Sequence, residues 1–220
     1  MKHIVIVFLL SFCFSSSAQN SIEYKNEQIN GIDENGLQTG IWKLYDDDKK
    51  IMITTEFKSG IVVSDTKYYN DSKLIASYKD NGLIEIYKDG KTIQGYFFRT
   101  KTGGQTIVDK NEKELDTETL KYFYFSGQVM PIYYEGSEQL YDFISKNIDY
   151  NAIKNNKGQV EVKFVIDTLG RTSEIEIVKS TNEALNEEAK RIVKMLPRWQ
   201  PAHQGGAFVK CPYIIPISVN

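Results

Sequence analysis

A two-residue alternation near the C-terminus most constrains what this chain can fold into. After Gly158, apolar side chains occupy every second position, at Val160, Val162, Phe164 and Ile166. Successive side chains of a β-strand point to opposite faces, so this period predicts a strand with one buried face. A turn at residues 168–171 and a second alternating run with Ile175 and Ile177 follow, so the sequence predicts an antiparallel hairpin.

Helical periods flank this hairpin on both sides. Before it, Ser137 is placed to cap a helix whose apolar residues share one face: Leu140, Phe143, Ile144 and Ile148. After it, a helix is expected to begin near residues 182–186 and to end at Pro197, with one apolar stripe: Leu185, Ala189, Ile192, Val193 and Leu196. Residues 208–219 predict a third strand. The order predicts an α+β fold with a three-stranded antiparallel sheet and both helices on one face.

The preceding region, residues 19–109, alternates short aromatic-rich β-prone runs with polar turns, which favours antiparallel hairpins. Residues 40–45 and 82–87 both place a glycine five positions before a tyrosine, and residues 64–69 look like a degenerate copy. This pattern resembles MORN-type repeats. The alternative is a β-meander whose tyrosines are packing residues. Residues 110–130 are expected to form a linker or helical connector, which leaves residues 131–220 for the α+β domain.

The N-terminus predicts export. Lys2 precedes an apolar run at residues 4–14, and small residues follow up to Ala18, which is the layout of a secretory signal peptide over residues 1–18. Cleavage is expected to leave Gln19 first, and an uncleaved leader would be a short anchor. Without Lys2 the chain has 26 basic and 29 acidic residues, a net charge of −3, and Cys211 as its single cysteine. One cysteine forms no internal disulfide, and a buried, inert thiol is expected.

Several blocks of the C-terminal region resemble the TonB C-terminal domain family over roughly residues 134–220. They are GQVEVKFVID at residues 158–167 with Gly170 after it, LNEEA at 185–189, MLPRWQPA at 195–202 and YIIPI at 213–217. The resemblance implies a periplasmic domain that binds an extended segment, the TonB box, of an outer-membrane transporter by strand addition. It also implies coupling to an inner-membrane energy source. The first proline is Pro131, so no proline-rich stalk precedes the domain as it does in TonB.

The last predicted strand carries prolines at positions of equal parity, Pro212 and Pro216. Proline lacks an N–H, so this side is expected to face outward while odd-numbered residues pair with the second strand. The donors left on the outward side are Ile214 and Ser218. These four residues are the predicted partner-binding edge, either a weakened docking site or a purely protective one. Trp199, between Pro197 and Pro201, is either an exposed partner contact or a core residue.

The inventory of reactive side chains gives no support for an enzyme. His203, near Gly205 and Gly206, is expected to be an ordinary loop residue. No cluster of histidines and cysteines predicts a metal site, and the aspartate triplet at residues 46–48 lacks the alternating ligands of a calcium loop. No catalytic, cofactor-binding or metal-binding residue is therefore predicted. The formal net charge of −2 gives no reason to expect nucleic acid as a partner.

Two hypotheses follow for an exported protein of the periplasm or cell envelope. In the first, a TonB-family protein binds an outer-membrane transporter by β-strand addition and takes part in TonB-dependent transport across the outer membrane, as energy transducer or accessory. In the second, the chain is a non-transducing envelope scaffold or interaction module that binds other envelope proteins.

Overall fold

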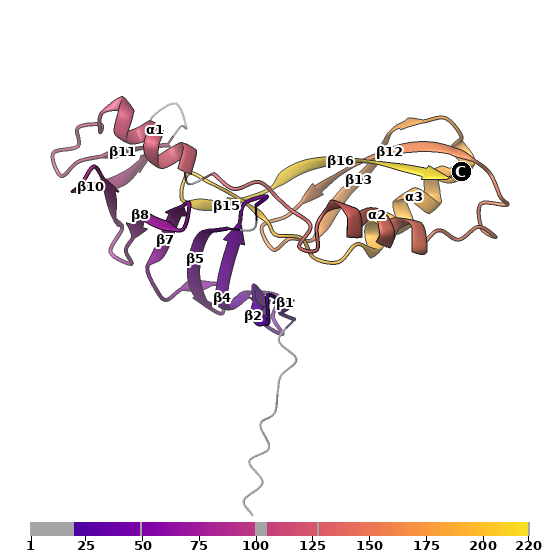
Figure 1. Ribbon diagram of the computed structural model, residues 1–220, viewed down its shortest axis with the longest axis horizontal. Helices are drawn as coiled ribbons and strands as arrows, with labels where there is room; N and C mark the ends of the chain where they lie inside the picture. The colour runs from indigo at the N-terminus through magenta and orange to yellow at the C-terminus, as the bar shows by residue number, and fades with distance from the viewer. Residues whose placement is uncertain (1–19, 49, 100–104, 127, 220) are drawn as a thin grey trace, which may run out of the picture.

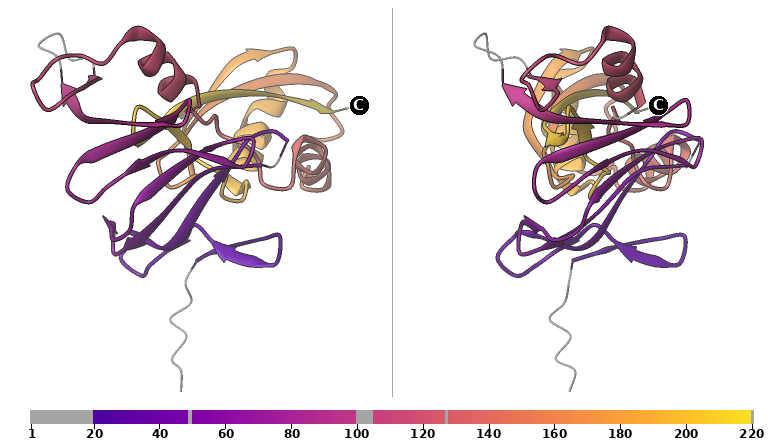
Figure 2. Two further views of the ribbon diagram at one scale, coloured as in Figure 1. Left: turned by 60° about the vertical axis from the view of Figure 1, so that its left-hand side comes forward. Right: turned by 90° about the vertical axis from the view of Figure 1, so that its left-hand side faces the viewer.

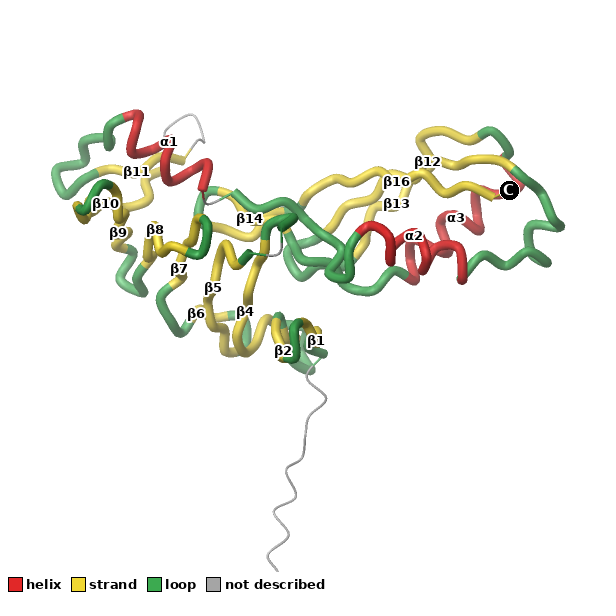
Figure 3. The backbone as a smooth tube through the Cα atoms, viewed as in Figure 1, coloured by secondary structure: helices red, strands yellow, loops and turns green. Residues whose placement is uncertain are grey.

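The computed structural model describes residues 20–48, 50–99, 105–126 and 128–219 (Figure 1). The predicted signal peptide, residues 1–18, and its cleavage site lie outside the described residues. Figure 3 shows strands throughout the N-terminal part and a mixture of strands and helices in the C-terminal part. The predicted α+β class is thereby confirmed, with an all-β hairpin region before the C-terminal sheet.

The N-terminal part is an antiparallel meander in which neighbouring strands follow chain order. The order in its main sheet is β11-β10-β9-β8-β7-β5-β4-β3, with β6 beside β5, and β1 and β2 form a separate hairpin. Its strands are β1 Ile22–Tyr24, β2 Glu27–Ile29, β3 Gly31–Ile32, β4 Gln38–Tyr45, β5 Ile51–Lys58, β6 Ile61–Val62, β7 Thr66–Asn70, β8 Lys73–Tyr78, β9 Leu83–Lys88, β10 Lys91–Arg99 and β11 Gln105–Val108.

Tight two-residue turns impose this meander. The turn between β9 and β10 is Asp89-Gly90, and both residues have positive φ, at 50° and 72°. Asp71 and Ser72, between β7 and β8, are also left-handed, at 48° and 64°. Such turns match the right-handed twist of the paired strands, and aspartate and glycine tolerate the conformation better than most residues.

One face of the N-terminal sheet is buried under helix α1, Thr117–Ser126, and under a later hairpin of the chain (Figure 2). Phe123 of α1 contacts Tyr68 of β7 with ring centroids 5.2 Å apart, and both side chains are buried. Helix α1 lies inside the segment 110–130, which was expected to be a linker or helical connector. Tyr45 and Tyr68 are buried packing residues. The likeness to MORN repeats stays a prediction.

The C-terminal part contains the predicted sheet and helices. Its elements are α2 Ser137–Lys146, β12 Gly158–Ile166, β13 Thr172–Ser180, the 3₁₀ turn η1 Glu183–Leu185, α3 Asn186–Met195, β14 Ala202–Gln204, β15 Ala207–Val209 and β16 Cys211–Val219. The apolar residues of β12 face both helices, and Phe164 is 0% exposed. Gly136, rather than Ser137, occupies the cap position of α2.

Two expectations about the third strand were wrong. It begins at Cys211, because residues 202–209 form the hairpin β14–β15 that packs on the N-terminal sheet. It also pairs with β12 and not with the second strand, so the order is β13-β12-β16. Helix α3 contacts both β13 and β12 and returns the chain across the sheet, so the next strand lies on the far side of β12. The alternation within a strand carries no information about which neighbour it takes.

The N-terminal and C-terminal parts are joined by two segments of the chain, one before α2 and one after α3. The segment around Val129 pairs with His203, and Ile132 pairs with Gln200. The side chain of Gln200 is fully buried and makes two hydrogen bonds to the backbone of Tyr45. Its Nε2 donates to the Tyr45 carbonyl oxygen at 2.7 Å, and its Oε1 accepts from the Tyr45 N–H at 2.7 Å. These polar contacts fix the N-terminal sheet against the C-terminal domain.

Candidate strand-docking edge

Strand β16 lies at one edge of the C-terminal sheet. Its nine residues pair with β12 from Cys211 opposite Ile166 to Val219 opposite Gly158. Among the described strands none pairs with its other side. An unpaired side of this length presents backbone donors and acceptors to any extended chain that approaches it.

The prolines decide which donors point outward. Pro212 stands opposite Val165 and Pro216 opposite Glu161. In an antiparallel ladder alternate residues exchange both backbone hydrogen bonds with their partner. Proline has no N–H, so the even-numbered residues are assigned to the outward-bonding positions. Ile214 and Ser218 then keep the outward donors, separated by roughly 13 Å at about 3.3 Å per residue.

The side chains of β16 separate cleanly between the two sheet faces. Ile215, Ile217 and Val219 are buried against the helices. Pro212, Ile214 and Ser218 are exposed, and Ile214 keeps 54% of its surface accessible. A partner strand added here would therefore extend the sheet without displacing a core side chain.

The opposite edge of the sheet, β13, is less suited to strand addition. Its register with β12 shifts twice, and Glu174 has φ 51°. Its exposed positions carry charges, among them Lys179, whose Nζ lies 3.7 Å from Oε1 of Glu161. Bulges and charges on an edge strand disfavour pairing with another chain. The sheet thus has one regular open edge and one irregular, charged edge.

Trp199 lies beneath the strand and not on the surface. It is 1% exposed, and its ring centroid is 4.9 Å from that of Tyr213 and 5.5 Å from that of Tyr133. Of the two interpretations of Trp199, a core residue or an exposed partner contact, its position fits the core residue. Its side chain is not accessible to a partner. Through Tyr213 this aromatic cluster supports the first half of β16.

The approach of Trp199 explains the glycine of the hairpin turn. Gly170 has φ 82°, and its carbonyl oxygen accepts a hydrogen bond from the Trp199 N–H at 2.8 Å. A Cβ at residue 170 would stand 1.9 Å from the Trp199 carbonyl oxygen. Any side chain would therefore push the turn away from the segment that leads into β14.

Two other residues singled out in the sequence, His203 and Cys211, are not among the four residues assigned to the outward side of β16. His203 is not a loop residue: it lies in β14, is 1% exposed, and its ring contacts those of Phe208 and Tyr68 at 5.3 Å and 5.7 Å. Cys211 is a half-buried free thiol whose pKa is raised by burial. Across the described residues there is no group of three or more histidine, cysteine or acidic side chains placed to hold a metal ion.

Sequence reasoning missed the residues that join the two parts of the molecule. Arg198 donates from Nη1 to the carbonyl oxygen of Asn20 at 2.6 Å and from Nη2 to that of Asn30 at 2.9 Å. Burial lowers the pKa of this guanidinium. Asn30 is itself buried and hydrogen-bonds to the hydroxyl of Tyr134, whose pKa is raised by burial. A hydrogen bond from a partly buried arginine to the carbonyl oxygen of a buried asparagine in a distant segment leaves no periodic signal in the sequence.

Comparison with protein families agrees with the resemblance seen in the sequence. Residues 149–218 match the family described as Gram-negative bacterial TonB protein C-terminal. That range contains β12, β13, α3 and all of β16 but Val219. It lies within residues 134–220, the region over which the sequence motifs resemble this family. Comparison with curated proteins and with solved structures found no match. Among the described residues, no helix is both long and apolar enough to cross a membrane.

Proposed function

We propose, from the match of residues 149–218 to the TonB C-terminal family, that this protein binds an extended segment of an outer-membrane transporter by strand addition along β16. It acts in TonB-dependent transport across the outer membrane, as energy transducer or accessory, and works in the periplasm or cell envelope. The observation that carries this proposal is the unpaired, regular side of β16 in a sheet of this family.

The docking edge comprises Pro212, Ile214, Pro216 and Ser218. Two outward N–H groups and the outward carbonyl groups supply the backbone bonds, each worth about 0.5–1.5 kcal/mol net. Half of the usual donors are absent, so backbone pairing alone gives a modest affinity. The exposed side chain of Ile214 adds apolar contact at the centre of the edge, where a partner's alternate side chains would meet it.

The scaffold function is a second candidate, and the buried contacts between the two parts favour it. Arg198 and Gln200 hold the N-terminal sheet and the C-terminal domain together, so the protein could present two surfaces in a fixed arrangement. Fractionation of the native protein separates the candidates. Retention in the inner membrane with an intact leader supports energy transduction, and release as a soluble periplasmic species supports the scaffold.

The test of strand addition is a titration of the full chain with TonB-box peptides from transporters of the same organism. Ser218→Pro removes one outward donor from an edge that already tolerates two prolines. We expect the fold to survive and the peptide affinity to fall roughly tenfold, which corresponds to about 1.4 kcal/mol. Ser218→Ala is the matched control, because it removes the hydroxyl and keeps the N–H, and it should bind as the wild type does.

Equal affinities for wild type and Ser218→Pro would exclude this side of β16 as the docking edge. If none of the three proteins bound the peptides, the scaffold function would be favoured. Circular dichroism spectra of the variants must match the wild type for either conclusion to hold.

A further inference from the structure

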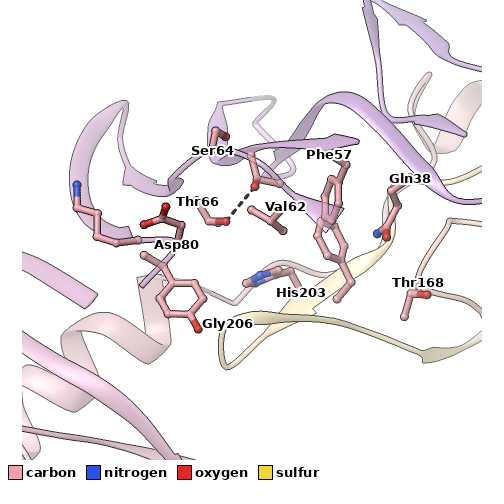
Figure 4. Close-up of a pocket in the computed structure, with 13 residues that line it drawn as sticks. Gln38, Phe57, Val62, Ser64, Thr66, Asp80, Thr168, His203 and Gly206 are labelled. Carbon is pink, nitrogen blue, oxygen red and sulfur yellow. Dashed lines mark hydrogen bonds between the residues drawn. The ribbon is translucent and has the colours of Figure 1, made fainter. Parts of the chain in front are cut away.

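A pocket lies where the buried face of the N-terminal sheet meets the hairpin β14–β15 and the turn after β12 (Figure 4). Its volume is about 420 Å³. This is near the lower end of the range, roughly 300–1,000 Å³, that is usual for small-molecule sites. The rings of Phe57, Tyr78, Phe208 and His203 line it. The pocket is separate from the outward side of β16.

Two threonine hydroxyls interrupt the buried face of the sheet at this pocket. These residues, Thr55 and Thr66, form the threonine pair and are 4% and 7% exposed. Their neighbours on the same face, Ile53, Phe57 and Tyr68, are large side chains of the core. Thr66 donates its hydroxyl to that of Thr55 at 2.9 Å, as the dashed line in Figure 4 shows. This bond uses only one of the two O–H groups, so the pair keeps a donor for a ligand.

Packing of the sheet does not account for the threonine pair. Valine has the same branched shape, suits a strand equally well and carries no hydroxyl that must leave water. Two further polar side chains line the pocket, Gln38 at the start of β4 and Thr168 in the turn after β12. Neither makes a hydrogen bond to another residue in the described part of the chain. These groups together indicate an occupant that both donates and accepts hydrogen bonds.

The charges of the lining favour an uncharged occupant. Apart from His203, the lining has one basic and one acidic residue, Lys79 and Asp80. Nζ of Lys79 lies 2.7 Å from Oδ2 of Asp65 and 3.4 Å from Oε2 of Glu85, which stand on the opposite face of the sheet. Asp80 is exposed to solvent. An ion inside the pocket would lose its hydration without gaining a buried counter-charge.

The aromatic walls favour a ring that carries C–H groups on its faces. The ring centroids of Phe57 and Phe208 are 5.9 Å apart, and those of His203 and Phe208 are 5.3 Å apart. The face of an aromatic ring is negative and attracts C–H groups. A sugar ring has C–H groups on its faces and hydroxyl groups around its edge, so it matches both the rings and the polar side chains. A purely apolar side chain would leave the polar side chains without a partner.

We propose that this pocket binds a neutral sugar ring. A C–H face of the sugar lies against the aromatic walls, and its hydroxyl groups bond to the threonine pair, Gln38 and Thr168. The exposed carboxylate of Asp80 accepts hydrogen bonds from the part of the ligand that leaves the pocket. This site gives the N-terminal part a ligand of its own, independent of strand addition at β16.

The experiment titrates the ¹⁵N-labelled full chain with four neutral sugars, D-glucose, D-galactose, D-mannose and N-acetyl-D-glucosamine, and follows backbone amide shifts. The uronate or amino-sugar counterpart of each sugar supplies a charged ring, and acetyl-Phe-amide supplies an apolar side chain. We expect at least one neutral sugar to give saturable shifts at Thr55, Thr66, Thr168 and Gly206. Its charged counterpart and acetyl-Phe-amide should bind at least several-fold more weakly. Tighter binding of an oligosaccharide than of the free sugar would identify a glycan chain as the source of the ring.

Thr55→Val combined with Thr66→Val removes both hydroxyls and keeps the shape of the side chains. We expect sugar binding to weaken at least tenfold while the melting temperature stays the same or rises, because replacing both partners of a hydrogen bond by apolar groups costs little stability. Thr54→Val, on the opposite face of β5, is the matched control and should bind as the wild type does.

The proposal is overturned if no neutral sugar gives shifts at the pocket, or if the charged counterparts or acetyl-Phe-amide bind as tightly. It is also overturned if the double variant keeps the wild-type affinity. A double variant that melts at a lower temperature or fails to fold would contradict it as well, because the threonine pair would then serve the stability of the sheet.

Discussion

Phe164 lies at the centre of the C-terminal core. Its ring centroid is 5.9 Å from that of Trp199 and 5.8 Å from that of Tyr213, and no part of the side chain reaches solvent. Because β16 and the segment before β14 both pack on this ring, it links the central strand to the docking edge. A cavity here would loosen both contacts at once.

Phe164→Ala should therefore lower the free energy of unfolding by about 3–5 kcal/mol, the usual cost of truncating a buried aromatic side chain. Urea unfolding followed by circular dichroism measures it. Lys163→Ala, on the exposed face of the same strand, is the control and should change stability by no more than about 0.5 kcal/mol. A loss below 1 kcal/mol for Phe164→Ala would contradict the assignment of this residue to the core.

At the scale of the element, the prolines of β16 leave this edge of the sheet with fewer backbone donors. Pro216 is half-buried and stands opposite Glu161 with its ring nitrogen assigned to the outward side. An edge with missing donors is a poor template for another copy of the chain. The same absence limits the number of bonds that a genuine partner strand can form.

Pro216→Val restores one outward N–H in a residue type that suits strands. We expect TonB-box peptides to bind several-fold more tightly, up to roughly tenfold for one added hydrogen bond. Analytical ultracentrifugation must first show that the variant is monomeric, because the restored donor also favours self-association. Unchanged affinity in a monomeric variant would mean that a bound peptide does not use this position.

The local elements of the C-terminal domain follow from the sequence, and its non-local pairings do not. Alternation at Val160 to Ile166 correctly predicted β12, and the helical stripe ending before Pro197 correctly predicted α3. The separate hairpin β14–β15 could not be predicted, because Phe208 is held by Trp42, 5.3 Å away between ring centroids and far off in the chain. The odd or even positions of the prolines predict which side of β16 faces outward. They do not predict which strand β16 pairs with, because that depends on the path of α3 across the sheet.

At the scale of the whole molecule, a single amide side chain joins β4 of the N-terminal sheet to the segment between α3 and β14. Gln200 satisfies both the N–H and the carbonyl oxygen of Tyr45, and burial raises the pKa of this tyrosine to about 12. Truncation of the glutamine would leave both backbone groups buried without a partner. Such groups cost about 1–3 kcal/mol each.

Gln200→Ala should therefore destabilise the contact between the two parts by a few kcal/mol, within the range set by those two groups. In calorimetry we expect one cooperative transition for the wild type and two separated transitions for the variant. Gln204→Ala, at an exposed position of the same hairpin, is the control and should keep a single transition. A single transition at the wild-type temperature for Gln200→Ala would show that this contact does not couple the two parts.

The contacts that Arg198 and Gln200 make between the two parts also set a geometric condition for bivalent binding. Since they hold the C-terminal domain against the N-terminal sheet, a partner that engaged both the β16 edge and a surface of the N-terminal sheet would freeze no motion between the two parts. The effective concentration of the second segment is then governed by the partner's own linker, and it is highest when the linker's average span equals the separation of the two surfaces. A linker too short to bridge the gap would forfeit the whole gain, so a rigid arrangement of the two parts would select bivalent partners by the spacing of their segments.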